Sequence, residues 1–421
     1  MITVSYSEYK QLVDRMNRDE YVLTPIFRDP HYHQAENKIL CVGVTFMENV
    51  DTYIVSISHD DAPRFDMPVG TNGFTDKDLC TLAYVCNEKI PIIQYDAYVN
   101  NTHAQFMMYR DTNKLIPLAV WGKLIREYNK KLIDVYNKHR GAVKDTAFQF
   151  VKRLNNVLEQ IEMSGLKTDK NILFSHYDRR IERNFKDDIV YSQYNTFTTT
   201  GRPSNRFGGI NFSAINKTDG SRKSFVSRYP NGVLVQMDFE AYHLRLIADQ
   251  YGVSLTDERL HTELACKYFD TDNITDEMYA AGKQKTFEII YGKSDETYNI
   301  PLFEKIVEVR QSMKAEDNMF KLPSGLNVYV TDPTPSKLFN YYVQSLEVVN
   351  ILPKLEKVLK FIETFNCHIV LYTYDSILLD IERFDETMLR EIENILSEES
   401  KFPLRLSAGV NYDDMHEFIL T

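Results

Sequence analysis

The sequence predicts an α+β fold with more than one domain, and three features of the chain carry this prediction. The chain has 421 residues, of which 43% are hydrophobic and 12% aromatic, enough for two to four well-packed domains. Strand-like runs dominate the first 110 residues, whereas strands and helices are mixed from Tyr191 onward. A long helical pattern lies between these two parts and places a domain boundary near residue 145.

The N-terminal part contains a predicted β-hairpin. The run KILCVGVTFMENVDTYIVSIS, residues 38–58, consists of two β-rich segments joined by a polar turn. The helical pattern that follows covers residues 145–165, with Gly165 placed as a helix stop. Its apolar residues recur every three or four positions, as one face of a helix requires: Phe148, Val151, Leu154, Leu158 and Ile161.

The C-terminal part contains two segments that present aspartates at strand ends. LVQMDFEAYHLRLIADQ, residues 234–250, is typical of a buried strand that leads directly into a helix, with Asp238 at the joint. HIVLYTYDSILLDIE, residues 368–382, predicts a hairpin with Asp375 at its tip, and between these two segments we expect helices over 255–320. An aspartate at a hairpin tip is often only a turn former. If the strand and the hairpin are neighbours, the two carboxylates converge, and a divalent cation such as Mg²⁺ would relieve their repulsion.

Charge and cysteine content bound the class of protein. No run of eighteen apolar residues and no signal-like N-terminus are present, so we expect a cytoplasmic protein without a membrane span. The five cysteines show no metal-type spacing, which predicts unpaired thiols. The net charge of −11 argues mildly against a nucleic-acid partner, but residues 197–230 carry six cations and one acid. This run fits either a phosphate-binding surface or a solvated loop.

Two helix faces combine polar and aromatic groups. Lys283, Phe287 and Tyr291 are spaced i, i+4 and i+8, so they share one helix face. Such a face fits a nucleotide platform, with the ammonium on a triphosphate and the rings against sugar and base, but it also fits a core stripe with a snorkelling lysine. Asn340 and Gln344 form an amide pair that suits minor-groove contacts or an ordinary polar face.

The order of these segments along the chain resembles the family A DNA polymerases, the family of bacterial DNA polymerase I and short phage replicative enzymes. The run VLEQIEMSGLKTD is similar to the segment before the thumb of that family, and the N-terminal runs KILCVGVTFMENVDTYIVSISHDD and PIIQYDAYVNN are similar in strand pattern to its 3′–5′ exonuclease domain. Five segments carry the resemblance: TTTGRPSNRFGGINFSAI, MDFEAYHLR, KQKTFEIIYG, YTYDS and AGVNYDDMHE.

The resemblance implies a role for each matching residue. Asp238 and Asp375, with the carbonyl of Phe239, would hold two Mg²⁺ ions, with Mn²⁺ as an alternative ion. Lys283 would bind the triphosphate of a dNTP, Phe287 would sense the sugar and Tyr291 would stand beside the templating base. Contacts to primer-template DNA are implied for Arg202, Asn211, Arg245, Asn340, Gln344 and Tyr374.

The same resemblance implies a domain organisation. Residues 1–143 would form a degenerate 3′–5′ exonuclease-like domain of RNase H-like α/β fold, and residues 144–200 a connecting helix with a vestigial thumb. The palm, an antiparallel sheet, would comprise 201–245 and 325–421, and the helical fingers 246–324. The exonuclease chemistry would be missing, because Thr24-Pro25-Ile26 stands where the family has Asp-x-Glu, and Asp96 alone cannot hold two metals.

Four departures from the family pattern shape the expectations. His243 stands where the family usually has a glutamate beneath the ribose 2′ position, Tyr279 where motif B begins with an arginine, and Ser376 where motif C ends in glutamate. A histidine still blocks a 2′-hydroxyl by its bulk. The thumb region is short, with only residues 170–197 between the flanking segments, so we expect weak DNA affinity and either a partner protein that supplies processivity or a task that needs only short synthesis.

The sequence therefore predicts a template-directed DNA polymerase of phage type that acts in replication or repair by two-metal-ion catalysis. One alternative is a catalytically weak or inactive DNA-binding or assembly subunit built on a polymerase fold. A second alternative, RNA synthesis or another nucleotidyl transfer, is left open by His243.

Overall fold

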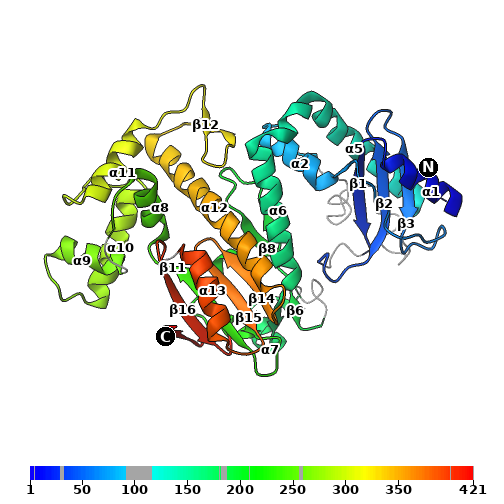
Figure 1. The fold of residues 1–421 in the computed structure, drawn as a ribbon. Helices are drawn as coiled ribbons and strands as arrows, with labels where there is room; N and C mark the ends of the chain where they lie inside the picture. The colour runs from blue at the N-terminus through cyan, green and yellow to red at the C-terminus, as the bar shows by residue number, and fades with distance from the viewer. Residues whose placement is uncertain are drawn as a thin grey trace. The chain divides into compact units, whose positions relative to one another are not determined.

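The chain divides into two compact units, here called the N-terminal and C-terminal units (Figure 1). The computed structural model describes residues 1–3, 5–28, 33–91, 116–179, 181, 187–207, 209–255, 259–398 and 400–420. The N-terminal unit comprises Met1–Lys152, and the C-terminal unit comprises Arg153–Ile181 and Asp187–Thr421. The division falls inside α6 (Thr146–Ser164), the helix predicted over 145–165, rather than before it. Asp96 lies outside the described residues.

The N-terminal unit is built on a four-stranded sheet with the order β3-β2-β1-β4. Strands β1 (Tyr21–Phe27), β2 (Ile39–Phe46) and β3 (Thr52–Ser56) are antiparallel, and β4 (Gly73–Thr75) runs parallel to β1. The predicted hairpin over 38–58 is therefore confirmed as β2 and β3. The helices of this unit are α1 (Tyr6–Met16), α2 (Asp76–Val85), α5 (Leu118–His139) and the 3₁₀ turn η1 (Arg140–Lys144).

Local sequence signals explain the N-terminal elements. Helices α1 and α2 both begin with a capping box, Ser5 with Glu8 and Thr75 with Asp78, which satisfies backbone N–H groups that have no partner inside the helix. Strand β2 is buried at every residue after Ile39, as expected for a central strand that is covered on both faces. Helix α5 packs its apolar face against this sheet through Trp121, Leu124 and Ile125.

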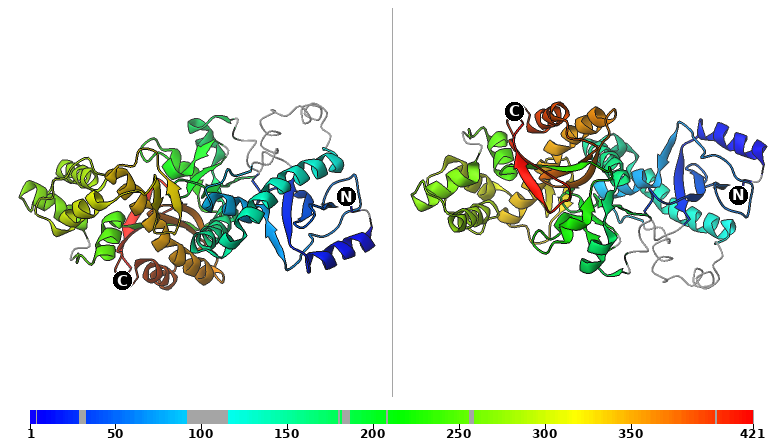
Figure 2. Two further views of the ribbon diagram at one scale, coloured as in Figure 1. Left: turned by 90° about the horizontal axis from the view of Figure 1, so that it is seen from above. Right: turned by 90° about the horizontal axis from the view of Figure 1, so that it is seen from below.

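The C-terminal unit contains a five-stranded antiparallel sheet with the order β14-β15-β11-β16-β17. Its strands are β11 (Val233–Phe239), β14 (Cys367–Thr373), β15 (Ser376–Ile381), β16 (Leu404–Gly409) and β17 (Met415–Phe418). Helices α12 (Pro335–Ile362) and α13 (Glu386–Ser397) lie together over one face of the sheet (Figures 1 and 2). The strand–helix and hairpin predictions for 234–250 and 368–382 are both confirmed.

A cluster of helices follows β11 and forms the yellow-green end of this unit in Figure 1. It consists of α8 (Tyr242–Tyr251), α9 (Leu260–Phe269), α10 (Asp276–Ile290) and α11 (Pro301–Ser312). The helices share one apolar core with α12, to which Ile247, Leu264, Ile289, Phe303 and Phe339 contribute. The helices predicted over 255–320 are therefore present, and an α+β fold is confirmed for the chain.

The C-terminal end of α10 is fixed by an arginine from α11. Arg310 is 2% exposed, and its guanidinium donates to the carbonyl oxygens of Ile289 and Ser294 and pairs with Asp295. A cation at this place satisfies carbonyl groups that have no partner in the helix and opposes the negative end of the helix dipole. Gly292 follows with φ +75°, and a side chain there would collide with Ser336.

Short elements connect α6 to the sheet. Gly165 ends α6 with φ +62°, as its predicted role as a helix stop requires. The remaining elements are β5 (Leu166–Thr168), α7 (Lys170–His176), β6 (Ile189–Val190), β7 (Tyr194–Asn195), β8 (Ser204–Phe207), β9 (Ile210–Asn211), η3 (Phe212–Ala214), η4 (Ser221–Ser224), β10 (Phe225–Val226), β12 (Met319–Lys321) and β13 (Asn327–Tyr329). All five cysteines are free thiols. Among the described helices, none has the length and apolar character needed to cross a bilayer.

Candidate active site

The two aspartates predicted to converge lie at the same end of the five-stranded sheet. Strand β11 pairs with β15 on one side and with β16 on the other, so that Ser376, Asp238 and Arg405 form a row across three strands. Directly opposed residues of antiparallel strands project from the same face, so these three side chains share one face. Asp375 precedes Ser376 in the β14–β15 turn, and its carbonyl oxygen accepts a hydrogen bond of 2.8 Å from the Phe239 N–H. The backbones that carry Asp238 and Asp375 are thereby tied together.

The turn that presents Asp375 has a strained backbone. Tyr374 adopts φ +63°, a left-handed conformation that costs a residue with a side chain about 1–2 kcal/mol. The guanidinium carbon of Arg202 lies 3.7 Å from the centroid of the Tyr374 ring, within the range of a cation–π interaction. Arg202 therefore helps to hold the turn in the conformation that places Asp375 beside β11.

Both aspartates are in surroundings that disfavour their charged forms. Burial, followed by the charge of Asp375, raises the pKa of Asp238 to about 6, although Arg405, Lys217 and Lys283 oppose this shift. Asp375 is accessible at the mouth of the site but crowded by protein atoms, and this desolvation, followed by the charge of Glu347, raises its pKa. Two carboxylates that repel one another in partly desolvated surroundings are stabilised by a cation between them.

The two aspartates fit Mg²⁺ better than a metal whose ligands all come from protein side chains. Within the described part of the chain, no group of three or more His, Cys, Asp and Glu side chains has a metal-binding arrangement. Mg²⁺ is commonly bound through one or two carboxylates, with water and substrate phosphates as its other ligands. Asp238 and Asp375 satisfy this requirement, and the carbonyl of Phe239 lies beside them at the strand end.

A cavity of about 150 Å³ opens beside the two aspartates. One helix, α10 with its C-terminal cap, contributes Lys283, Phe287, Ile290 and Tyr291, so the predicted helix face does line a cavity. Its complete lining is Arg202, Asp238, Phe239, Ala241, Tyr242, His243, Leu244, His261, Lys283, Phe287, Ile290, Tyr291, Asp375 and Arg405. The structure thus brings anionic metal-type ligands, cations and aromatic rings to one place.

His243 is held at the cavity by two hydrogen bonds. Its Nε2 lies 2.5 Å from Oε2 of Glu347, and its Nδ1 lies 3.1 Å from the hydroxyl oxygen of Tyr291. If Nε2–H donates to the carboxylate, Nδ1 is left to accept from the Tyr291 hydroxyl. His243 thus links the helix that follows β11 to the end of α10.

Glu347 is a site residue that the sequence analysis missed. It is fully buried, and it binds Arg202 through Nε at 3.1 Å and Nη2 at 3.0 Å as well as His243. Burial alone would raise its pKa, but the hydrogen bonds and charges of His243 and Arg202 hold the pKa below its usual value. The available signal was its position on α12, three residues after Gln344 and seven after Asn340, which puts a carboxylate on the face of the amide pair.

His261, on α9, was also missed, because no motif marks it in the sequence. It is 6% exposed and packs edge-to-face with Tyr279 and Phe287, at centroid distances of 6.4 and 6.1 Å. Burial, followed by the charges of Lys283, Arg405 and Arg245, lowers its pKa to about 4, so its ring is neutral at pH 7. Its buried Nδ1 has no hydrogen-bond partner among the described residues.

The residues expected to contact DNA lie in different surroundings. Gln344 donates to Asn340 at 3.0 Å and accepts from the hydroxyl of Thr200 at 3.1 Å, so the amide pair is already hydrogen-bonded. Asn211 is half-buried at the end of β9. Arg245 is 7% exposed and pairs with Glu240, Nη2 to Oε2, at 2.9 Å. This burial argues against the DNA contact expected for Arg245 and assigns it a structural ion pair.

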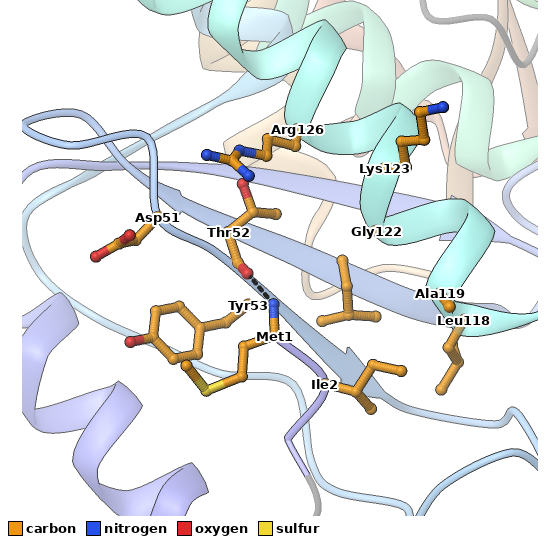
Figure 3. Close-up of a pocket in the computed structure, with 11 residues that line it drawn as sticks. Met1, Ile2, Asp51, Thr52, Tyr53, Leu118, Ala119, Gly122, Lys123 and Arg126 are labelled. Atoms are coloured by element: carbon orange, nitrogen blue, oxygen red, sulfur yellow. Dashed lines mark hydrogen bonds between the residues drawn. The ribbon is translucent and has the colours of Figure 1, made fainter.

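The N-terminal unit has a hollow of about 500 Å³ between β3 and α5, shown in Figure 3. The Thr52 carbonyl accepts a hydrogen bond from the amino group of Met1 there. Asp51 is the acid of its lining, and this carboxylate pairs with Arg15 at 3.3 Å. Among the described residues that line this hollow Asp51 is the one carboxylate, whereas the C-terminal cavity has two, Asp238 and Asp375.

Strand β1 of the same unit carries neutral polar groups where an exonuclease would need acids. Thr24 is fully buried, and its hydroxyl donates to Oδ1 of Asn129 at 2.8 Å. Nδ2 of Asn129 in turn donates to the Thr45 hydroxyl at 2.9 Å, and the hydroxyls of Thr45 and Thr52 are 3.1 Å apart. This buried network contains no ionisable side chain.

Comparison with known proteins shows which fold this is. No protein-family model and no curated protein matches the chain. Among solved structures, it is similar to the POL domain of Pol1 from M. smegmatis, determined in complex with DNA primer-template and dNTP. The TM-score is 0.66 at 11% sequence identity, and the likeness covers 99% of this chain and 100% of that chain. The resemblance to a family A DNA polymerase is therefore confirmed at the level of the fold.

Proposed function

We propose that the chain is a template-directed DNA polymerase that transfers a deoxynucleotide from a dNTP to a primer 3′-hydroxyl. One observation carries the proposal: Asp238 and Asp375 meet at one end of an antiparallel sheet, in a cavity that Lys283, Phe287 and Tyr291 also line. The similarity of the fold to a POL domain whose structure contains primer-template and dNTP supports the same function. The phage role and the action in a host cytoplasm belong to this proposal.

Each group in the cavity would have a distinct task. Asp238 and Asp375, with the Phe239 carbonyl, would hold two Mg²⁺ ions, which stabilise the attacking and leaving oxygens of phosphoryl transfer. Lys283 would pair with the triphosphate as a point charge. The rings of Phe287 and Tyr291 would pack against the sugar and base, since an aromatic face accepts any base.

In this reaction the primer 3′-oxygen attacks the α-phosphorus, and the bond from the α-phosphorus to the bridging oxygen of pyrophosphate breaks. The protein acts mainly by positioning and by stabilising charge. His243 would restrict the sugar, because the buried carboxylate of Glu347 and the hydroxyl of Tyr291 fix its ring beside the cavity. A ring held in this way would exclude a 2′-hydroxyl by bulk.

One observation favours the alternative, a DNA-binding or assembly subunit without catalysis. Arg202, expected to reach the primer, is already bound to Glu347 and stacked on Tyr374. Asn340 and Gln344 are likewise bonded to each other. A protein whose DNA-contacting groups stay engaged would bind primer-template weakly, and a partner that supplies processivity would then be needed for sustained synthesis.

A primer-extension assay with Mg²⁺ and dNTPs tests the proposal. We expect the wild type to extend a primer, and Asp238→Ala and Asp375→Ala each to reduce the rate by about 1,000-fold or more, because each removes a metal ligand. Asp134→Ala, on an exposed position of α5, is the matched control for loss of one carboxylate. A wild type that binds primer-template but extends no better than these two variants would establish the alternative. Equal incorporation of rNTPs and dNTPs would contradict the role of His243.

A further inference from the structure

Arg405 stands out because no part of the sequence analysis gave it a role. It lies on β16 directly opposite Asp238, and its Nη2 is 3.6 Å from Oδ1 of that aspartate. Its side chain is 49% exposed. An ion pair that is this long and this exposed contributes little to stability, since such pairs are typically worth 0–1 kcal/mol. The guanidinium can therefore exchange this partner for another anion at small cost.

A triphosphate bound in the cavity would need more positive charge than α10 supplies. A triphosphate is strongly anionic, but α10 presents a single ammonium there, that of Lys283, and the residue one turn earlier is Tyr279. His261 is neutral at pH 7 because its pKa is about 4, and Arg202 is occupied by Glu347. Besides Lys283, Arg405 is the described cationic side chain of the cavity lining whose present contact is long and exposed.

The size of the cavity also indicates that a bound nucleotide would extend beyond it, toward Arg405. A volume of about 150 Å³ is too small for a nucleotide, because ligand pockets usually have about 300–1,000 Å³. A second hollow of about 610 Å³ shares Arg405 with the first as a lining residue. Tyr279 and Arg259 also line the second hollow, as do the acids Glu240, Glu393 and Glu417. A nucleotide on the Phe287 and Tyr291 rings can thus extend its phosphates past Arg405.

We propose that Arg405 is a triphosphate-binding residue that donates to the terminal phosphates of the incoming nucleotide. Its planar guanidinium suits bidentate binding of phosphate oxygens. The palm sheet would then supply, from the strand beside Asp238, the second cation that α10 lacks. This inference rests on the proposed function for its ligand, a nucleoside triphosphate, but its test requires no synthesis.

The test is calorimetric binding to the full chain in the presence of Mg²⁺, with dGTP, dGMP and inorganic tripolyphosphate as probes. We expect Arg405→Leu to weaken dGTP and tripolyphosphate by about tenfold or more and dGMP by less than twofold, because only the first two reach the guanidinium. Arg405→Lys should lie between wild type and Arg405→Leu. Arg383→Leu, at an exposed position beyond the far end of β15, is the matched control and should leave all three affinities unchanged.

A rescue variant makes the test sharper. Tyr279 lies one turn before Lys283 and lines the second hollow together with Arg405, so Tyr279→Arg introduces a cation there from α10 instead of β16. In the Arg405→Leu background this substitution should recover most of the affinity for tripolyphosphate. Rescue of this kind would not occur if Arg405 merely held Asp238 in place.

Three results would overturn the inference: unchanged affinities in Arg405→Leu, losses for dGMP as large as those for dGTP, or a wild type that does not bind tripolyphosphate. Arg405→Gln serves as the second variant if Arg405→Leu fails to fold. In the extension assay the expected signature is a raised KM for dNTP with little change in kcat. A wild type that binds tripolyphosphate through Arg405 but does not extend a primer would refute the proposed function and leave this inference standing.

Discussion

The two units use polar residues in opposite ways on similar scaffolds. In each, one polar residue on a central strand of the sheet decides the comparison. In the C-terminal unit this residue is Asp238, whose charged form is destabilised by burial and by Asp375. In the N-terminal unit it is Thr24, which is fully satisfied by Asn129. The hydrogen bonds of the neutral network are satisfied within the protein, whereas a bound cation would stabilise the paired carboxylates.

The polar network of the N-terminal unit contributes to the stability of that unit, whereas the C-terminal unit contains charges that a bound ligand would balance. A buried, satisfied network of neutral groups makes a core specific and rigid. Partly desolvated charges are costly unless they are compensated. The charges of the C-terminal unit are compensated only in part within the protein: Glu347 has two partners, whereas Asp238 has one long, exposed contact to Arg405. Chemistry is therefore expected from the C-terminal unit alone.

Among the variants that test this comparison and leave both aspartates in place, Glu347→Ala is expected to have the largest effect. The substitution leaves the guanidinium of Arg202 and the ring of His243 without their buried partner, and breaking a buried ion pair typically costs about 3–5 kcal/mol. We expect the extension rate to fall about 100-fold or more. Glu347→Gln, which keeps one hydrogen-bond acceptor, should lose about tenfold.

Fluorescence of the single tryptophan of the chain provides the control for this variant. Trp121 is buried in the N-terminal unit, so its emission reports the unfolding of that unit. Glu347→Ala should leave the tryptophan-detected transition where it is in the wild type. A variant that extends as fast as the wild type would show that the Arg202–Glu347–His243 contacts do not organise the site.

The reverse pattern is expected for Asn129→Ala. This substitution removes the acceptor of Thr24 and the donor to Thr45 within a closed core, so the free energy of unfolding of the N-terminal unit should fall by about 2–4 kcal/mol. The tryptophan-detected midpoint in urea should drop, and extension at 20 °C should stay within twofold of wild type. Lys130→Ala, at the adjacent exposed position of α5, is the control and should change neither quantity. A large loss of extension would contradict the separation between the units.

The sequence predicted the parts of the site that depend on local pattern. The strand–helix of 234–250, the hairpin of 368–382 and the α10 face all follow from short-range periodicity, and each is present in the structure. From the sequence, Asp238 and Asp375 could be expected to converge only if their strands are neighbours, because tertiary pairing decides which strands lie side by side. The β14-β15-β11-β16 order fulfils that condition.

The residues that sequence reasoning missed all act through contacts between distant segments. Glu347 shares a helix face with Asn340 and Gln344, but its role follows from the contacts of α12 with Arg202 and His243; His261 becomes a candidate only once α9 packs on α10. Arg405 becomes a candidate site residue because the strand register places it opposite Asp238, and this register cannot be deduced from the sequence of one strand. Arg245 shows the converse: its surface role was inferred from a motif, but tertiary packing buries it against Glu240.

The two units should also differ in their response to pH and Mg²⁺. The pKa of Asp238 is about 6 in the fold against 3.8 ordinarily, so its charge destabilises the metal-free protein above pH 6, and protonation relieves this as the pH falls through 6. Mg²⁺ competes with that proton. At limiting Mg²⁺ we expect the extension rate to be flat above about pH 6.5 and to fall up to tenfold per pH unit below 6. Saturating Mg²⁺ should move the fall to lower pH.

Thermal unfolding at several pH values checks the same point without catalysis. Mg²⁺ should raise the midpoint of the C-terminal unit, followed by circular dichroism, above pH 6 and have little effect near pH 5. The tryptophan-detected transition of the N-terminal unit should not respond to Mg²⁺ at either pH. A Mg²⁺ response in the N-terminal unit would show that it holds a metal site and would break the contrast between the units.

The smallest expected effect concerns a second buried charge of the C-terminal unit, Lys354. Its side chain is 3% exposed and lies 4.0 Å from the Phe402 ring centroid, with Asn350 at 2.7 Å and Glu398 at 3.3 Å. Burial lowers its pKa to about 8 against 10.5 ordinarily, so the cost of the charged form is full below pH 8 and declines as the pH rises from 8 toward 10.5. Lys354→Met should therefore raise the free energy of unfolding by about 1–2 kcal/mol at pH 7, with a smaller gain at pH 9.5. Urea unfolding followed by circular dichroism measures this difference, and destabilisation at pH 7 would mean that the lysine, like Glu347, is fully compensated by its neighbours.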